Sequence, residues 1–342
     1  MSDTKMQLKL SYILGLRDAV LEEIEQYPEL EILKESKDSF YVKYLEDFNT
    51  VKNLRSISRA YLVSIDSRFN PLYISNHKSV LGELIQNLFA KNNVHDFSTF
   101  KIYCAGSDSP EVLETERYVE ERFKIQKNEE ADLKIYIIKV GDTWELGVQI
   151  TPRPLSFRSY KVRNMNGAMD PTIAYSLNRL CRLEKHETYL NIFSGSATLL
   201  IEAGQCYDNL KKIIGFDNNK VHLSLSIQNI RNAGLIKRVQ IKEGNIFDKP
   251  NLGKFDVITS DLPFGMAVSK GEDLKKLYKV FIEYAQEHLN KKGVLGIYTS
   301  EFKIFEELIK GSRLRLVKEL KVKRMTSEEQ YLPVKLMVFN CK

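Results

Sequence analysis

The chain has 342 residues, of which 43% are hydrophobic, 28% charged and 10% aromatic, and its formal net charge is +6. This composition is typical of soluble globular proteins and excludes fibrous and intrinsically disordered chains. No apolar run reaches the roughly 20 residues that cross a bilayer, and the N-terminus lacks the apolar core of a secretion signal, so we expect a cytoplasmic protein without a membrane partner.

The length and the cysteines narrow the class further. Single hydrophobic cores stop growing at roughly 250 to 300 residues, which favours two or three domains here. The four cysteines and five histidines show neither C-x-x-C nor Cys/His ligand spacing. We therefore expect reduced thiols, no metal site and no catalytic histidine.

The N-terminal half predicts two α+β modules in succession, which we expect to be domains of residues 1–66 and 67–155. Period-two alternation predicts strands and apolar residues at helical spacing predict helices. The first module would hold strands 8–14, 39–45 and 61–65 with helices 16–27 and 49–60. The second would hold helices 80–91 and 110–126 with strands 99–104, 133–140 and 144–150. A Gly141-Asp142 turn would join the last two strands as a hairpin.

A proline-containing, basic junction follows. Pro152 and Pro154 interrupt regular structure, and we expect a linker over residues 156–168. The stretch contains no acidic residue between Glu145 and Asp170, and its cations are Arg153, Arg158, Lys161 and Arg163. Such a run could contact phosphates by releasing counterions from a polyanion, or it could form a solvated surface loop.

Residues 169–342 predict a doubly wound α/β domain. Asp170 followed by Pro171 resembles a helix N-cap with proline at the first helical position. The predicted helices are 171–183, 198–206, 220–233 and 274–289, and the predicted strands are 189–193, 213–217, 239–243, 255–260 and 293–299. Their alternation is typical of parallel crossovers, and ligands of such sheets bind at the carboxyl ends of the strands.

Three strand ends form a candidate nucleoside site. Residues 191–197 make a small-residue turn where a ligand can approach the backbone, although such turns also serve only to pack a helix on a sheet. Asp217 ends the next strand, where its carboxylate can accept hydrogen bonds from both hydroxyls of a ribose. Asn245 follows the third strand and could recognise an adenine edge. Together they favour an adenosyl ligand.

The phosphate-binding motifs are missing. The turn holds only Gly195 and lacks G-x-G-x-x-G, which argues against a dinucleotide, since a pyrophosphate needs close backbone contact. There is no G-x-x-x-x-G-K-[ST] either, which argues against nucleoside triphosphate hydrolysis.

The segment Ser260–Gly265, directly after an apolar strand, carries the sharpest chemical signal. An exocyclic amine on a base is a poor nucleophile because its lone pair is delocalised into the ring. The Asp261 carboxylate and the Leu262 carbonyl could accept its two hydrogens and aim the lone pair. Pro263 stiffens the turn and Phe264 offers a stacking face for an extruded base. The alternative is an ordinary Asp/Pro/Gly turn that ends a strand.

These motifs resemble the THUMP-domain class I RNA methyltransferases, a group that includes the tRNA guanine-N2 methyltransferases, and the resemblance spans nearly the whole chain. Residues 12–24 look like the start of their ferredoxin-like domain, 131–150 like the end of a THUMP domain, and 154–160 like their basic junction. Residues 191–201 are similar to the D-P-F-x-G-S-G-T cofactor loop and 261–265 to the N/D-P-P-Y/F-G catalytic motif. The sequence departs from these patterns at Asn191, Ile192, Ala197 and Leu262.

The resemblance implies the cofactor S-adenosyl-L-methionine and an RNA partner, most specifically tRNA. It would place the cofactor against Asp170, Thr172, Asn191, Phe193, Ser194, Gly195, Ser196, Asp217, Asn218, Asn245 and Ile246. The target base would lie at Asp261, Leu262, Pro263 and Phe264, and the four junction cations would contact phosphates. The expected reaction is methylation of guanine N2 in tRNA by a monomer without metal. The alternatives are guanine-N2 or adenine-N6 methylation of ribosomal RNA, and a non-catalytic RNA-binding protein with a degenerate cofactor site.

Overall fold

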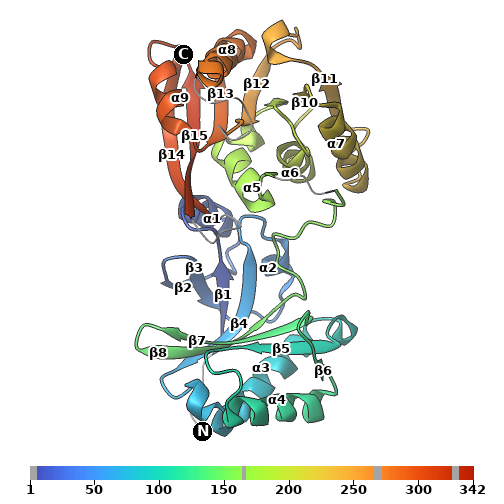
Figure 1. The fold of residues 1–342 in the computed structure, drawn as a ribbon, viewed down its shortest axis with the longest axis vertical. Helices are drawn as coiled ribbons and strands as arrows, with labels where there is room; N and C mark the ends of the chain where they lie inside the picture. Colours follow the sequence, from blue (N-terminus) through green and yellow to red (C-terminus); the bar gives the residue numbers. More distant parts are fainter. Residues whose placement is uncertain (1–5, 164–166, 265–271, 326–330) are drawn as a thin grey trace. The chain divides into compact units, whose positions relative to one another are not determined.

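A computed structural model describes residues 6–163, 167–264, 272–325 and 331–342. The chain forms two compact units, one of Met1–Tyr12 and Leu21–Ser156 and the other of Ile13–Val20 and Phe157–Lys342 (Figure 1). No helix within the described residues combines the length and the apolar character that a bilayer span requires.

The N-terminal unit is built on one eight-stranded sheet with the strand order β2-β3-β1-β4-β8-β7-β5-β6. Its strands are β1 (Gln7–Ser11), β2 (Ile32–Glu35), β3 (Ser39–Lys43), β4 (Arg59–Asp66), β5 (Thr99–Tyr103), β6 (Gln126–Lys127), β7 (Leu133–Val140) and β8 (Thr143–Gln149). Its helices are α2 (Asn49–Asn53), α3 (Lys78–Ala90) and α4 (Pro110–Phe123), and helix α1 (Arg17–Ile24) is divided between the two units after Val20. Strand β4 pairs with β1 on one side and β8 on the other, so the sheet continues across residue 66. A division there into two domains stays a prediction.

Two differences from the predicted elements have clear physical causes. The helix expected over 49–60 ends at Asn53, because the Glu23 carboxylate accepts the backbone N–H groups of Arg55 (2.9 Å) and Ser56 (2.8 Å). These donors are therefore satisfied outside a helix. Strand β2 was not predicted. All four of its residues are exposed at the sheet edge, so its sequence does not alternate between apolar and polar residues.

The C-terminal unit is the predicted doubly wound domain, with the strand order β11-β10-β9-β12-β13-β15-β14. Its strands are β9 (Thr188–Ile192), β10 (Lys212–Asp217), β11 (Val239–Glu243), β12 (Phe255–Asp261), β13 (Leu289–Thr299), β14 (Leu314–Met325) and β15 (Tyr331–Cys341). Its helices are α5 (Pro171–Leu180), α6 (Thr198–Cys206), α7 (Lys220–Asn232), α8 (Glu272–His288) and α9 (Phe302–Leu308). Strands β9 to β13 run parallel, while β15 is antiparallel to both β13 and β14.

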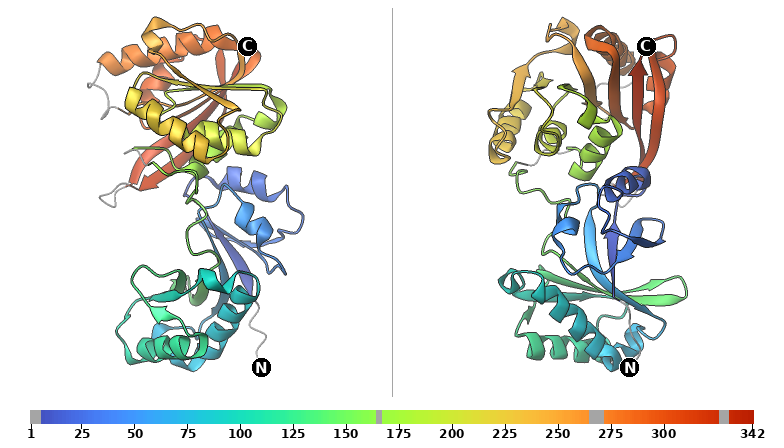
Figure 2. Two further views of the ribbon diagram at one scale, coloured as in Figure 1. Left: turned by 90° about the vertical axis from the view of Figure 1, so that its right-hand side faces the viewer. Right: turned by 180° about the vertical axis from the view of Figure 1, so that it is seen from behind.

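Helices cover both faces of this sheet, as Figures 1 and 2 show. Aromatic side chains of α8 and α9 share a buried core with alternate residues of the central strands. On the opposite face α6 packs so close to β10 that a Cβ added at Gly215 would lie 2.3 Å from the Leu200 side chain. The strand order reverses at β9, which pairs with β10 on one side and β12 on the other. A ligand crevice is expected at this point, outside the carboxyl ends of the strands.

Candidate active site

A cavity of about 680 Å³ opens at the carboxyl ends of β9, β10 and β12. Nine of the eleven predicted cofactor residues line it, namely Asn191, Phe193, Ser194, Gly195, Ser196, Asp217, Asn218, Asn245 and Ile246. All four residues of the predicted base-binding turn, Asp261 to Phe264, line it too. Gly265, the last residue of that motif, lies outside the described residues. The loop after β9 and the turn after β12 therefore line the same cavity.

The loop between β9 and α6 is sharply wound. Phe193, Gly195 and Ala197 have φ values of +57°, +52° and +67°, in the left-handed region. Only glycine enters this region without steric cost, so the two side-chain-bearing residues are held there by their surroundings. Ala197 is fully buried at the N-cap of α6.

Two side chains of helix α7 hold this loop through hydrogen bonds to its backbone. The Ser226 hydroxyl donates to the Gly195 carbonyl (2.5 Å), and the Asn229 amide donates to the Ser196 carbonyl (3.2 Å). Both α7 side chains are fully buried. They were not predicted, because nothing in the local pattern of α7 shows which backbone they reach.

Asp217 joins the ends of two strands. Its Oδ2 accepts the Gly195 N–H and its Oδ1 accepts the Asn219 N–H, both at 2.9 Å. The side chain is 8% exposed and lines the cavity. His222 Nδ1 lies 3.5 Å from Oδ1, which places a histidine at the site where the sequence had assigned none a role.

A buried hydrogen-bond network links the cofactor loop to the catalytic strand. Asn191 donates through Nδ2 to the Thr259 carbonyl (3.1 Å), across the β9–β12 pair. The Tyr189 hydroxyl bonds to both Asn178 Oδ1 (2.8 Å) and Thr259 Oγ1 (2.5 Å). Asn178 in turn donates to the Leu199 carbonyl of α6 (2.9 Å). The loop and the turn are thus fixed to the same strand.

The turn itself is anchored at two of its peptide groups. Leu262 N–H donates to the Tyr298 carbonyl (3.0 Å), and the Pro263 carbonyl accepts the Tyr278 hydroxyl (2.9 Å). The Phe264 ring lies 5.8 Å from the Tyr298 ring and is partly exposed to the cavity. An acceptor and an aromatic face therefore stand together at the carboxyl end of β12.

Asn245 uses half of its amide locally, because its Oδ1 accepts the Phe247 N–H (3.1 Å) and begins a short 3-10 helix. Among the described residues nothing bonds its Nδ2, which leaves that donor for a ligand. The neighbouring Phe247 ring is 47% exposed and also lines the cavity.

Asp170 and Thr172 require a correction. Asp170 caps α5, where its Oδ1 accepts both the backbone N–H (2.8 Å) and the hydroxyl (2.6 Å) of Thr172, and Pro171 opens the helix as predicted. Neither of the two lines the cavity, to which the preceding Ala168 and Met169 contribute instead. We assign Asp170 and Thr172 to helix capping.

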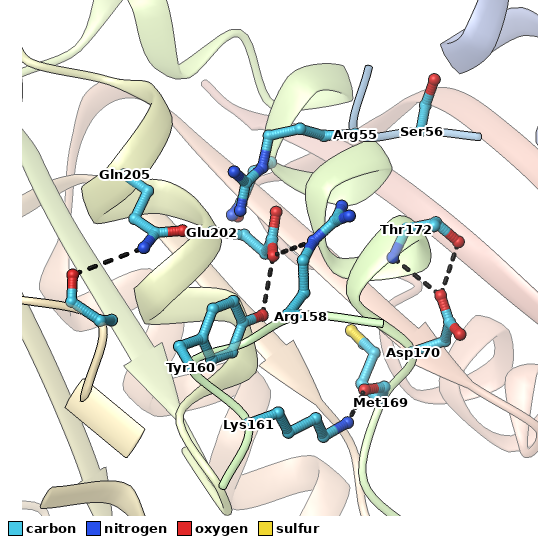
Figure 3. Close-up of polar contacts among 12 residues, drawn as sticks. Arg55, Ser56, Arg158, Tyr160, Lys161, Met169, Asp170, Thr172, Glu202 and Gln205 are labelled. Atoms are coloured by element: carbon cyan, nitrogen blue, oxygen red, sulfur yellow. Dashed lines mark hydrogen bonds and ion pairs between the residues drawn. The ribbon is translucent and has the colours of Figure 1, made fainter. Parts of the chain in front are cut away.

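Two of the four junction cations are structural (Figure 3). The Arg158 side chain is only 10% exposed, and its Nε donates to Glu202 Oε1 (3.0 Å), which also accepts the Tyr160 hydroxyl (2.7 Å). Lys161 Nζ donates to the Met169 carbonyl (3.1 Å). These side chains fix the junction to α5 and α6, so we withdraw Arg158 and Lys161 as phosphate contacts.

The other two predicted cations, Arg153 and Arg163, are exposed. Arg163 Nε donates to Gln228 (2.9 Å), and its backbone exchanges hydrogen bonds with the Asn229 side chain.

No cluster of three or more His, Cys, Asp or Glu suited to a metal occurs in the described part of the chain. Its four cysteines are free thiols.

Comparison with known proteins agrees with this geometry. A family model described as the RMKL-like methyltransferase domain, UPF0020, matches residues 158–330. A tRNA (guanine(6)-N2)-methyltransferase of Archaeoglobus fulgidus is 23% identical over 344 residues, covering 90% of this chain and 87% of the relative. The enzyme of the same name from Thermus thermophilus is 30% identical over 200 residues, covering 56% and 57%.

Solved structures share the fold over almost the full length. TrmN from Thermus thermophilus aligns with a TM-score of 0.77 at 19% identity, covering 98% of this chain and 100% of that one. SMU.472, a methyltransferase fold solved with SAH, aligns at 0.72 and 17%, covering 99% of each chain. The family match spans half of the sequence, and the chain belongs to the RMKL-like methyltransferases. The predicted kinship with methyltransferases is confirmed, while a THUMP domain at residues 67–155 stays a prediction.

Proposed function

We propose that the protein uses S-adenosyl-L-methionine to methylate the exocyclic amino group of an RNA base, guanine N2 in tRNA. The observation that carries this proposal is the single cavity that joins the Asn191–Ala197 loop to the Asp261–Phe264 turn. A donor pocket and an amine acceptor site must be continuous for direct transfer, because the reacting atoms have to come within about 3 to 3.5 Å.

The residues of the loop suit an adenosyl ligand better than a phosphate-bearing one. The N–H groups of Ser194, Gly195 and Ala197 bond to Phe216, Asp217 and Ser194 within the protein. A pyrophosphate would need such donors. The Ser194 hydroxyl is buried at the cavity wall and has no partner among the described residues, so it is a polar group that a ligand can satisfy.

We assign the cofactor's ribose to Asp217, whose carboxylate oxygens each retain an accepting lone pair. Asn245 Nδ2 would donate to the adenine edge. The cofactor supplies an electrophilic methyl group on a sulfonium. On the opposite side, Asp261 and the Leu262 carbonyl accept the amine hydrogens and aim its lone pair, while Phe264 stacks on the base. The amine proton leaves to Asp261 or to water.

The RNA partner and the base come from the relatives. The proteins from Archaeoglobus fulgidus and Thermus thermophilus are named as tRNA guanine-N2 methyltransferases, and one from Bos taurus as a U6 snRNA guanine-N2 methyltransferase. We propose that the N-terminal unit, with its ferredoxin-like and THUMP parts, holds the RNA. Arg153 and Arg163 are the junction cations that remain exposed for phosphates. A cytoplasmic location and a monomeric state stay predictions.

Methyl transfer to purified tRNA and rRNA, followed by nucleoside mass spectrometry, tests the function. We expect N2-methylguanosine in tRNA, dependent on S-adenosyl-L-methionine. Asp261→Asn should abolish transfer and leave cofactor affinity within about twofold, since Asp261 faces the amine. If the product is N6-methyladenosine, or if only rRNA is methylated, guanine N2 of tRNA is not the substrate. Failure to bind the cofactor in calorimetry would instead support a non-catalytic RNA-binding protein.

A further inference from the structure

We propose that the Tyr278 hydroxyl is a positioning residue for methyl transfer, which holds the Leu262 carbonyl in the orientation that accepts the substrate amine. The inference rests on the proposed function for its kinetic consequence. Its structural consequence can be measured without any substrate.

A buried chain of hydrogen bonds runs from the end of β13 through α8 to the turn. The Glu301 N–H donates to Thr299 Oγ1 (3.0 Å), the Thr299 hydroxyl bonds to the Tyr278 oxygen (3.0 Å), and the Tyr278 hydroxyl donates to the Pro263 carbonyl (2.9 Å). A carbonyl can only accept, so the direction of the last bond is fixed, and Thr299 is then the donor to Tyr278. Bonds aligned in this way strengthen one another in a low-dielectric interior.

The Tyr278 hydroxyl keeps its proton at neutral pH, so it can donate. Its ring and Thr299 are fully buried. That burial raises the pKa of the Tyr278 hydroxyl well above its ordinary value of 10.

A second hydrogen bond anchors the peptide group that precedes the Leu262 carbonyl in the chain. Leu262 N–H donates to the Tyr298 carbonyl at the end of β13 (3.0 Å), and the Leu262 side chain is 1% exposed. The Leu262 carbonyl therefore lies between two fixed groups, its own N–H and the Pro263 carbonyl. Within the described residues nothing donates to it. Because Leu262 lines the cavity, its carbonyl is the acceptor that we assign to the substrate amine.

The identity of residue 262 gives this arrangement its significance. A proline there, as in the N/D-P-P-Y/F-G pattern, would fix the backbone through its ring and could donate no hydrogen bond. Leucine lacks the ring constraint and gains the donor. In this chain, hydrogen bonds from neighbouring elements restrain the turn where a ring constraint is missing.

The chain offers a closely matched control on the same helix. Tyr284 is also fully buried in α8, and its hydroxyl also donates to a proline carbonyl, that of Pro250 (2.7 Å). Pro250 does not line the cavity. Tyr278→Phe and Tyr284→Phe thus remove the same atom from the same kind of bond, and only the first bond holds the turn. Phenylalanine keeps the ring that packs on Phe305 at 6.0 Å.

Two readouts separate positioning from stability. Amide hydrogen exchange of the ligand-free protein should show the Leu262 N–H exchanging about 10-fold faster in Tyr278→Phe and unchanged in Tyr284→Phe. With RNA and cofactor, Tyr278→Phe should lower kcat about 10-fold, with KM and the cofactor Kd within about twofold. Thr299→Val should also lower kcat, and Thr299→Ser, which keeps the hydroxyl, should leave kcat unchanged.

Equal kcat and equal exchange in the two phenylalanine variants would overturn the proposal. Loss of kcat in both would assign Tyr278 a purely structural role and would overturn it as well. If the unaltered protein methylates no RNA, the proposed function fails, and the exchange rates of Leu262 alone then decide whether the hydroxyl restrains the turn.

Discussion

Gly195 and Asp217 join two strand ends through one hydrogen bond, in which the glycine N–H donates to the aspartate Oδ2 over 2.9 Å. The carboxylate accepts a second N–H, from Asn219, on its other oxygen. One side chain therefore holds the Asn191–Ala197 loop and also stands at the site that we propose for the ribose of the cofactor. This dual role makes Asp217 more sensitive to substitution than a ligand contact alone.

Asp217→Asn is expected to weaken cofactor binding by about 100-fold. The oxygen of an amide can accept only one of the two N–H groups, which leaves the other, part-buried N–H without this partner at a cost of about 1 to 3 kcal/mol. Calorimetry with S-adenosyl-L-methionine measures the affinity, and thermal unfolding should show a lower Tm. Unchanged affinity would remove Asp217 from the cofactor site.

Substitutions at Ala197 should report the backbone strain of the loop. Its φ of +67° costs a side-chain-bearing residue about 1 to 2 kcal/mol. Ala197→Gly relieves this cost but loses a buried methyl worth about 0.8 kcal/mol and frees the unfolded chain by about 0.4 to 1 kcal/mol. We expect a net change within about 1 kcal/mol.

Ala197→Val is the contrasting variant. A β-branched side chain is poorly tolerated at positive φ, and the site is fully buried. We expect a loss above about 2 kcal/mol in the free energy of unfolding, measured in urea. A valine variant as stable as the glycine variant would show that the loop is not held at this conformation.

Arg158 is expected to matter for folding rather than for RNA affinity. Arg158→Met leaves the fully buried Glu202 without its Nε partner, and breaking a buried pair costs about 3 to 5 kcal/mol. Adding Glu202→Gln should recover much of the loss, because it removes the buried charge that has lost its Arg158 partner. Urea unfolding of the single and double variants measures this. A stable Arg158→Met that binds RNA with a reduced salt dependence would restore Arg158 as a phosphate contact.

Asp66 should give the N-terminal unit a specific acid sensitivity. Hydrogen bonds from Arg68, chiefly from its side chain, lower the pKa of Asp66 from 3.8 to about 2. A depressed folded-state pKa stabilises the fold above pH 4, and this contribution is lost as the pH falls from about 4 to 2. Since the Arg68 side chain is 58% exposed, solvent screening reduces the effect to about 1 kcal/mol.

Asp66→Asn should therefore lower the free energy of unfolding at pH 7 by about 1 kcal/mol and have a much smaller effect near pH 2. Urea titrations at both pH values measure the difference. A loss of equal size at both would attribute it to packing.

The strands and helix caps that were predicted correctly came from local sequence patterns. Two patterns depend on neighbouring residues alone: the apolar strand Phe255–Asp261, which ends in an acidic residue before a proline-containing turn, and the strand that ends in Asp217. Alternation and caps are local too, and Asp170 was recognised as an N-cap for that reason. Its placement against the cofactor rested on resemblance, and the structure shows it capping α5 outside the residues that line the cavity.

What the sequence could not show depends on long-range contacts. Tyr278, Ser226 and Asn229 look like ordinary helix residues until the fold brings a backbone carbonyl to each. The charge of Arg158 suggested a phosphate, and only the buried Glu202, 44 positions away, reveals its partner. No element was predicted beyond Thr299, where α9, β14 and β15 complete the sheet.

Asn229 bonds through Nδ2 to the carbonyls of both Arg163 and Ser196. The polypeptide entering the catalytic domain and the rim of the donor pocket therefore share one amide group. A displacement of the junction at Arg163 would therefore reach the cofactor loop at Ser196 through a single side chain.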